Sequence, residues 1–259
     1  MLRIAVLGAG RMGRELIAAA ASSDDLELAG VWVRGPGRFD PKLVPATGVA
    51  SGDINEVLAA AEVAVDFSLA AATGEVLAGV VKAGLPLVCG VTGLGDREVQ
   101  QMRAAANSIP LFYDRNMSLG IAVLKELVAR AAPLLQPGFV AAIHETHHVH
   151  KKDAPSGTAM ALGEALARSL GRKFEDLYRF ETGGEQRRSP EDIVIRATRR
   201  GEVAGEHTVL FQSDAESLEL THKVSERGVF AQGALQAARW LVQREPGLYD
   251  MSDLMISRL

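Results

Sequence analysis

The chain has 259 residues, of which 47% are hydrophobic and 23% are charged, so it can bury the core of one large or two modest domains. Its 28 Lys and Arg residues against 32 Asp and Glu leave a net charge of −4, which argues against sequence-independent binding to nucleic acid or to anionic membranes. No uncharged apolar run approaches the roughly 18 residues that a membrane span needs. We therefore expect a globular protein with no nucleic-acid partner and no membrane segment.

The single cysteine, Cys89, cannot form a disulfide within the chain. The first ten residues, MLRIAVLGAG, have a glycine turn where a signal peptide would carry a long apolar stretch. Both features predict a protein of the reducing cytoplasm.

Short apolar runs alternate with helix-like stretches through the first half of the chain. This rhythm is typical of βαβ units with a parallel sheet. The expected strands are 3–7, 26–33, 63–66, 86–89 and 110–112, and the expected helices are 12–21, 53–61, 72–83 and 96–107. The first half is therefore predicted to be an α/β domain, a Rossmann-type doubly wound parallel sheet.

The pattern changes after residue 118. A helical stretch at 120–132, a β-like run at 139–150 and a helix at 156–170 precede three expected strands, 192–198, 207–213 and 217–223. Short polar turns join these three strands, and strands joined in this way are normally antiparallel neighbours. We therefore expect a C-terminal α+β domain, built on an open sheet.

The predicted boundaries are 1–118 for the first domain and 119–228 for the second domain. A closing helix at 230–243 has apolar residues at Leu235, Ala238 and Leu241 that suit either domain. We expect the C-terminal segment 229–259 to pack back onto the first domain.

A glycine turn, GAGRMG at residues 8–13, directly follows the first expected strand and precedes the first helix. Gly8 suits a tight turn, Gly10 lets the backbone approach a pyrophosphate, and Gly13 lets the helix pack close to the strand. The free amides and positive dipole at the helix start then bind phosphate. The pattern favours dinucleotide binding over an ordinary glycine turn.

The end of the second expected strand bears on cofactor choice. The acidic residue that binds the ribose hydroxyls of NAD usually stands about 20 residues beyond the last glycine, and here that place is Val33, followed by Arg34. Arg34, with Arg38, suits a ribose 2′-phosphate and hence NADPH. The alternative is that both arginines are solvated loop residues.

Four of the six histidines lie in IHETHHVHKKDAPSGTA, at positions 144, 147, 148 and 150. Residues 144–148 match HExxH, the zinc-protease pattern, which requires a helix. The preceding FVAAI is β-like and Pro155 would soon end a helix, so we expect a strand and no metal site. A strand places Glu145 and His147 on one face and His144, His148 and His150 on the other.

A helix start follows the histidines. Ser156 is the natural N-cap, and Gly157 and Thr158 supply free backbone amides. These amides, the Thr158 hydroxyl and the nearby Lys151 ammonium suit a carboxylate. A simple capped helix explains Ser156 equally well, but it does not explain the histidines and lysines immediately upstream.

The segment ETHHVHKKDAPSGTA, residues 145–159, closely resembles the signature of bacterial dihydrodipicolinate reductases, the nicotinamide-dependent reductases of lysine and diaminopimelate biosynthesis. The resemblance covers nearly the whole chain. GAGRMGREL, DFS at 66–68, CGVTG at 89–93, RNMSLG at 115–120, GEHTV at 205–209 and the terminal LYDMSDL are similar to family segments in family order.

The resemblance implies roles for individual residues. His147 would be the catalytic acid or base and Lys151 the proton donor. The dicarboxylate substrate would contact His148, Lys151, Ser156, Gly157 and Thr158. The cofactor, NADPH in preference to NADH, would contact Gly8, Ala9, Gly10, Arg11, Met12, Gly13, Arg34, Gly90, Val91, Thr92, Asp114, Arg115, Asn116 and Met117.

Two departures from the family pattern concern the cofactor. Some members have an acidic residue where this chain has Val33, and the valine in its place argues against NADH as the cofactor. Several have alanines and a phenylalanine where this chain has Asp114, Arg115 and Met117. The resemblance also implies that the second domain, 119–228, serves substrate binding and oligomerisation, with a homotetramer assembled through its open sheet.

The implied reaction adds hydride to a cyclic imine dicarboxylate, either 4-hydroxy-tetrahydrodipicolinate or the dihydro form that it gives on losing water. The product is tetrahydrodipicolinate, and the hydroxyl of the substrate leaves as water. The added hydride creates negative charge that a proton must cancel, and an imidazole, with a pKa of about 6.5, is a suitable donor. The alternatives are another two-domain dehydrogenase, of the aspartate or homoserine type, and a non-catalytic NADPH-binding regulator. Neither has a reason to carry HHVHK before DAPSGT.

Overall fold

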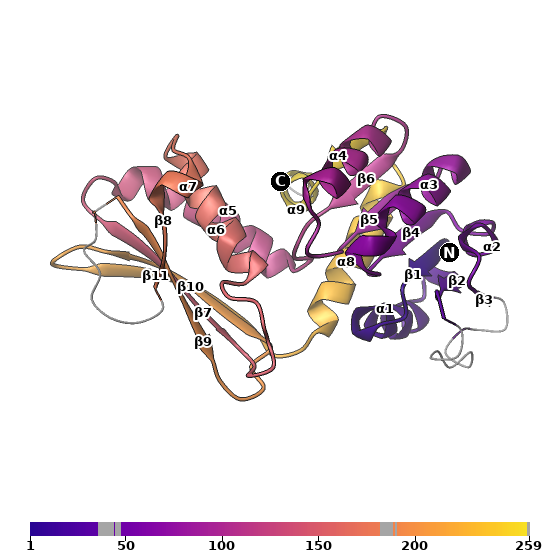
Figure 1. Cartoon of the computed structure of the whole chain (residues 1–259), viewed down its shortest axis with the longest axis horizontal. Coiled ribbons are helices and arrows are strands. Elements are labelled where there is room, and N and C mark those ends of the chain that lie inside the picture. The colour runs from indigo at the N-terminus through magenta and orange to yellow at the C-terminus, as the bar shows by residue number, and fades with distance from the viewer. Residues whose placement is uncertain (36–43, 45–47, 182–188, 190, 258–259) are drawn as a thin grey trace. The chain divides into compact units, whose positions relative to one another are not determined.

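The computed structural model describes residues 1–35, 44, 48–181, 189 and 191–257. The chain divides into two compact units (Figure 1). Unit 1 comprises Met1–Ser118 and Arg227–Leu259, and unit 2 comprises Leu119–Glu226.

Unit 1 is built on a seven-stranded sheet in the order β12-β6-β5-β4-β1-β2-β3, and every neighbouring pair is parallel. Its central strands are apolar on both faces, as in a sheet covered by helices on both sides. The strands are β1 Leu2–Leu7, β2 Leu26–Trp32, β3 Val49–Ser51, β4 Val63–Asp66, β5 Leu87–Cys89, β6 Pro110–Tyr113 and β12 Gly247–Tyr249.

Helices form a layer on each face of this sheet (Figure 1). On one face, α1 (Arg11–Ala21) packs against α8 (Gly228–Leu241), which also contacts β4, β5 and β6. The other layer holds α2 Ile54–Leu58, α3 Thr73–Ala83 and α4 Asp96–Ala105. The remaining elements are the 3₁₀ turn η3 Ala70–Ala72 and α9 Met251–Ile256.

Unit 2 has a five-stranded mixed sheet in the order β11-β10-β7-β9-β8. β7 is central, antiparallel to β10 and parallel to β9. The strands are β7 Val140–His147, β8 Tyr178–Glu181, β9 Ile193–Arg199, β10 Gly205–Gln212 and β11 Ser217–Val224.

One face of this second sheet is covered by α5 (Leu119–Leu135) and α6 (Gly157–Ser169), with the short α7 (Phe174–Leu177) beside α6. The side chains alternate accordingly along β7, buried on the helix side and partly exposed on the other. Within the part of the chain that the structure describes, no helix covers the opposite face. The sheet is therefore open, and the predicted fold class is confirmed.

The expected strand neighbours of unit 2 need a correction. β9 and β10 follow each other in sequence but are not paired, because β7 lies between them. The β7–β10 and β7–β9 pairs bury a shared apolar face, and this tertiary pairing replaces the expected hairpin. Strands β3, β8 and β12, of three or four residues each, were not expected, nor were α7 and α9.

A second correction concerns the end of the histidine strand. β7 stops at His147, so His148 and His150 lie in the turn that follows it rather than on a strand face. Among the described residues, no helix has both the length and the apolar character needed to cross a bilayer.

Candidate active site

The glycine turn connects β1 to α1 in unit 1. Gly8 has φ +96°, a conformation that side chains disfavour, and a Cβ there would lie 2.8 Å from the Ser68 Cα. A Cβ at Gly13 would lie 1.9 Å from the Gly8 carbonyl oxygen, so helix and turn are in direct contact. A Cβ at Gly10 would meet no described atom within 4 Å. The open space beside Gly10 and the amides of α1 fit a pyrophosphate.

The other predicted cofactor segments follow neighbouring strands at the same edge. Gly90–Thr92 and Asp114–Met117 come after the carboxyl ends of β5 and β6. Parallel strands bring these ends to one edge of the sheet, the usual place for a dinucleotide. The Met117 side chain is buried in the core, and its carbonyl oxygen lies against Gly233 of α8.

Arg34 lies exposed just beyond β2, with its guanidinium carbon 5.8 Å from the ring centroid of Trp32. The Trp32 indole is itself held by a hydrogen bond to the Gly52 carbonyl oxygen, at 2.9 Å. Arg34 therefore stands at the edge where an adenosine ribose is expected. Arg38 lies outside the described residues.

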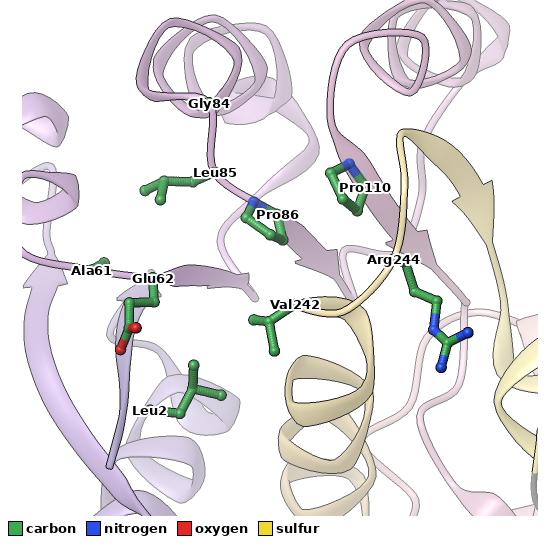
Figure 2. A pocket seen from close by; sticks show the side chains of 9 residues that line it. All are labelled: Leu2, Ala61, Glu62, Gly84, Leu85, Pro86, Pro110, Val242 and Arg244. Atoms are coloured by element: carbon green, nitrogen blue, oxygen red, sulfur yellow. The ribbon is translucent and has the colours of Figure 1, made fainter.

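A pocket of about 600 Å³ opens elsewhere on unit 1 (Figure 2). It is lined by Leu2, Ala61, Glu62, Gly84, Leu85, Pro86, Pro110, Val242 and Arg244. Several of these residues stand at or just before the starts of β1, β4, β5 and β6, so the pocket is at the edge opposite the glycine turn. It is not part of the expected cofactor site.

In unit 2, β7 carries the histidine motif and places Glu145 and His147 on the buried face, as predicted, while His144 is on the open face. The Nδ1 atom of His147 lies 3.0 Å from Oε2 of Glu145. A Cβ at Gly205 would lie 3.2 Å from the other ring nitrogen, Nε2.

Glu145 is fully buried at its side chain. Its Oε1 atom accepts a hydrogen bond from the Ser156 amide at 3.0 Å and lies 3.4 Å from the Arg199 guanidinium. Burial raises the pKa of Glu145, but the contacts with His147 and Ser156 lower it by more than burial raises it, so that the pKa is about 2. The carboxylate is therefore ionised at neutral pH.

His207 of β10 completes this buried cluster. Its ring packs edge-on against His147 with centroids 5.1 Å apart, and its Nε2 atom lies 3.2 Å from the Ser156 hydroxyl. Burial and the electrostatic effect of the neighbouring His147 lower the pKa of His207 to about 3, so this ring is neutral.

Sequence reasoning assigned no role to His207 or Arg199, which lie about 50 residues beyond the motif. A signal for His207 does exist. His207 is on the same buried face of β10 as Val209 and Phe211, at every second residue. A polar ring therefore occupies a core position that needs a polar partner. Arg199 ends β9 and donates hydrogen bonds to the carbonyl oxygens of Asp153 at 2.6 Å and Thr198 at 2.9 Å.

Lys151 and the start of α6 lie in the same unit. The Lys151 Nζ atom contacts both carboxylate oxygens of Asp153, at 2.7 and 2.8 Å, and the side chain is 21% exposed. Ser156 caps α6 by accepting a hydrogen bond from the Ala159 amide at 3.2 Å. Gly157, at the helix start, is exposed, and Thr158 is half-buried. This arrangement is a helix N-terminus beside a cation, which suits a carboxylate.

The HExxH match has no helical geometry, because residues 144–147 are a strand with His144 on the face opposite Glu145. A different trio, Glu145, His147 and His207, has one ligand atom each within 4.8 Å of the others. The Arg199 guanidinium lies 3.4 Å from Oε1 of this carboxylate, so a metal ion there would have to share Glu145 with an arginine.

Comparison with known proteins decides the family. Residues 2–117 match the family model described as dihydrodipicolinate reductase, N-terminus, and residues 120–255 match the one described as dihydrodipicolinate reductase, C-terminus. The chain belongs to the dihydrodipicolinate reductase family. Among curated relatives, the 4-hydroxy-tetrahydrodipicolinate reductase of Alkalilimnicola ehrlichii is 41% identical and that of Thiobacillus denitrificans 40% identical, each aligned over 98% of both chains.

A solved structure supports the fold of this family member. A dipicolinate-bound dihydrodipicolinate reductase from Paenisporosarcina sp. TG-14 superposes with a TM-score of 0.77 at 20% identity, over 96% of this chain and 97% of that one. This reductase therefore transfers hydride from a nicotinamide dinucleotide to 4-hydroxy-tetrahydrodipicolinate, in lysine and diaminopimelate biosynthesis.

Proposed function

We propose that His147 donates the proton of this reduction. Lys151, with the start of α6, holds a carboxylate of the substrate and can deliver a proton to its nitrogen or its leaving hydroxyl. The observation that carries the proposal is the contact of His147 with the buried, ionised Glu145, because a carboxylate stabilises an imidazolium that is about to give up its proton. When bound, the nicotinamide cofactor supplies the hydride.

The substrate is a dicarboxylate, and the region after β7 supplies complementary charge. The amides of Gly157 and Thr158 begin α6, where the helix dipole favours an anion. Lys151 contacts Asp153 in the structure, so a substrate carboxylate would share or replace that partner. Ser156 holds the helix start in place, and His148 supplies a further polar group in the turn after β7.

The proposal is tested with His147→Gln and Lys151→Ala. Each should lower turnover by roughly two to four powers of ten, the usual scale for a positioned proton-transfer group. His150→Gln and Lys152→Ala are matched controls, since both residues belong to the same motif and are exposed. Near-normal turnover in both test variants, with the fold intact, would remove the proposed roles.

On the cofactor side, we propose contacts from Gly8–Gly13, Gly90–Thr92 and Asp114–Met117, with Arg34 binding the 2′-phosphate of NADPH. Val33 has no hydrogen-bond acceptor in its side chain for the ribose hydroxyls that an acidic residue binds in NAD enzymes. The exposed Arg34 guanidinium lies 5.8 Å from the Trp32 ring centroid, just beyond the carboxyl end of β2, which supports its assignment to the ribose phosphate.

Calorimetric titration of both cofactors tests this preference. NADPH should bind more tightly than NADH by about 1.5 to 3 kcal/mol, or one to two powers of ten in affinity, the scale of a charge-assisted hydrogen bond. Arg34→Ala should weaken NADPH binding alone, and Arg103→Ala, an exposed arginine of α4, should change neither. Equal affinities in the wild type, or equal losses in the variant, would contradict the assignment.

We also propose a cytoplasmic homotetramer, assembled through the open face of the unit 2 sheet. That face leaves Val140 43% exposed and carries polar side chains such as Thr208 and Thr221, which hydrogen-bond to each other. Cys89 is a buried free thiol, which suits a reducing compartment. Light scattering should give four times the 27.5 kDa of the chain, whereas a monomer at micromolar concentration would contradict assembly.

A further inference from the structure

Both carboxylate oxygens of Glu145 have polar neighbours. Oε1 accepts the Ser156 amide and lies beside Arg199, while Oε2 lies 3.0 Å from the His147 Nδ1 atom. Arg199 is fixed in turn by the carbonyl oxygens of Asp153 and Thr198. A buried carboxylate is costly unless it is paired, and the groups that contact Glu145 come from β7, β9 and the start of α6.

The two nitrogens of the His147 ring have different surroundings. Nδ1 faces the Glu145 carboxylate, whereas Nε2 faces Gly205, at the start of β10. A Cβ at that position would be 3.2 Å from Nε2, closer than side chains normally pack. The glycine therefore leaves the approach to Nε2 unobstructed by a side chain of its own.

We propose that Glu145 is a positioning residue for His147, holding the proton on Nδ1 so that the ring delivers its transferable proton from Nε2. The inference rests on the proposed role of His147. In the step, the Nε2–H bond breaks and the proton cancels the negative charge that the added hydride leaves on the substrate. His147 becomes a neutral ring that keeps its Nδ1 proton against Glu145, and water returns the other proton.

The neighbouring imidazole does not compete for this role. His207 lies 3.9 Å from the Glu145 Oε2 atom, against 3.0 Å for His147, and its Nε2 atom contacts the Ser156 hydroxyl. The titratable and charged groups that make up the cluster around His147 are Glu145 on β7, Arg199 on β9, His207 on β10, His222 on β11 and Lys151 in the turn after β7.

The first test is Glu145→Gln, which keeps the shape and removes the charge. We expect kcat to fall about 10- to 100-fold, the scale for removing a group that orients a functional histidine, with KM changed less than about threefold. The alkaline limb of the pH profile should move to lower pH, because the imidazolium loses the anion that stabilises it. Asp192→Asn is the matched control, a buried carboxylate at the opposite end of β9 that contacts Arg179 and the Ser189 amide.

A double-variant cycle separates positioning from general support of the fold. If Glu145 acts through His147, Glu145→Gln should change the residual turnover of His147→Gln by less than about threefold. An equal loss in both backgrounds would overturn the inference but leave the role of His147 intact. Full turnover in His147→Gln would instead overturn the proposed function.

Nitrogen-15 NMR of the wild-type holoenzyme keeps the inference testable even where Glu145→Gln does not fold. The neutral His147 ring, assigned from the signal lost in His147→Gln, should carry its proton on Nδ1. A proton on Nε2 in the neutral ring would overturn the inference. So would wild-type kcat and pH dependence in a folded Glu145→Gln protein.

Discussion

Gly13 is constrained at the scale of single atoms, because a Cβ there would lie 1.9 Å from the Gly8 carbonyl oxygen. Gly13→Ala should therefore destabilise unit 1 by about 1 to 3 kcal/mol, the usual cost of overpacking, and weaken cofactor binding. Gly74→Ala, in α3, is the control, since its Cβ would make only ordinary contacts, at 3.9 Å, with the Gln101 side chain of α4. Chemical denaturation measures both variants, and equal stability of the two would contradict the close contact.

Asp66 is a buried carboxyl at the carboxyl end of β4, and burial raises its pKa to about 6 despite hydrogen bonds from Ser68. The folded chain holds this proton more tightly than the unfolded chain, whose carboxyl has a pKa near 3.8. The contribution of Asp66 to stability is therefore greatest below pH 4 and declines as the pH rises to about 6.

Asp66→Asn should remove this dependence and stabilise the protein at pH 7.5 by about 2 to 3 kcal/mol, the equivalent of the pKa shift. The measurement is the free energy of unfolding from urea titrations at pH 4.5 and 7.5. Parallel pH profiles for the variant and the wild type would contradict the raised pKa.

The residues of the site were predictable from sequence only where they are local. His147, Lys151 and Ser156 lie within ten residues of one another, and the alternation of β7 correctly predicted that Glu145 and His147 share a face. Arg199 reaches the same cluster from a strand whose place in the sheet depends on tertiary pairing. No local pattern predicts that contact.

Among the elements, the start of α6 has two roles, one in helix stability and one in the site. Ser156 caps the helix through the Ala159 amide and also contacts His207. Ser156→Ala should cost about 1 to 2 kcal/mol of stability, the value of an N-cap, and raise KM for the dicarboxylate. Ser169→Ala, at the other end of α6, should change stability by less than about 0.5 kcal/mol and leave KM unchanged. An unchanged KM in Ser156→Ala would separate the cap from substrate binding.

The helices and strands of unit 1 follow the predicted rhythm closely because each long strand is an apolar run between turn signals. The missed strands β3, β8 and β12 have three or four residues, too few for a periodic signal, and they form only by pairing with a longer strand. The mistaken β9–β10 pairing has the same origin, since sequence gives the strands but not the partner that lies between them.

At the scale of the whole molecule, acid should affect the two units in opposite directions. Burial lowers the pKa of His207 to about 3 from 6.5, so its contribution to stability is complete above pH 6.5 and is lost as the pH falls. Glu145, with a pKa of about 2, adds a further loss below about pH 4.5. Asp66 in unit 1 has the opposite dependence.

Both tryptophans of the chain, Trp32 and Trp240, belong to unit 1, so their fluorescence reports that unit alone. At pH 7.5 fluorescence and circular dichroism should give similar melting curves. At pH 5 the circular dichroism should show unit 2 melting first, because multidomain proteins need not unfold in one step. Coincident curves at both pH values, or earlier loss of the fluorescence signal at pH 5, would contradict the opposed pH dependence.

This molecule reduces a cyclic imine dicarboxylate with hydride from a nicotinamide dinucleotide. The most direct measurement of this reaction is the absorbance of NADPH in the presence of the purified protein, with and without the aldol product of pyruvate and aspartate semialdehyde. One NADPH should be oxidised per molecule of that product, and none without it. Oxidation at the same rate without the product, or no oxidation of NADPH or NADH when it is supplied, would contradict the assigned reaction.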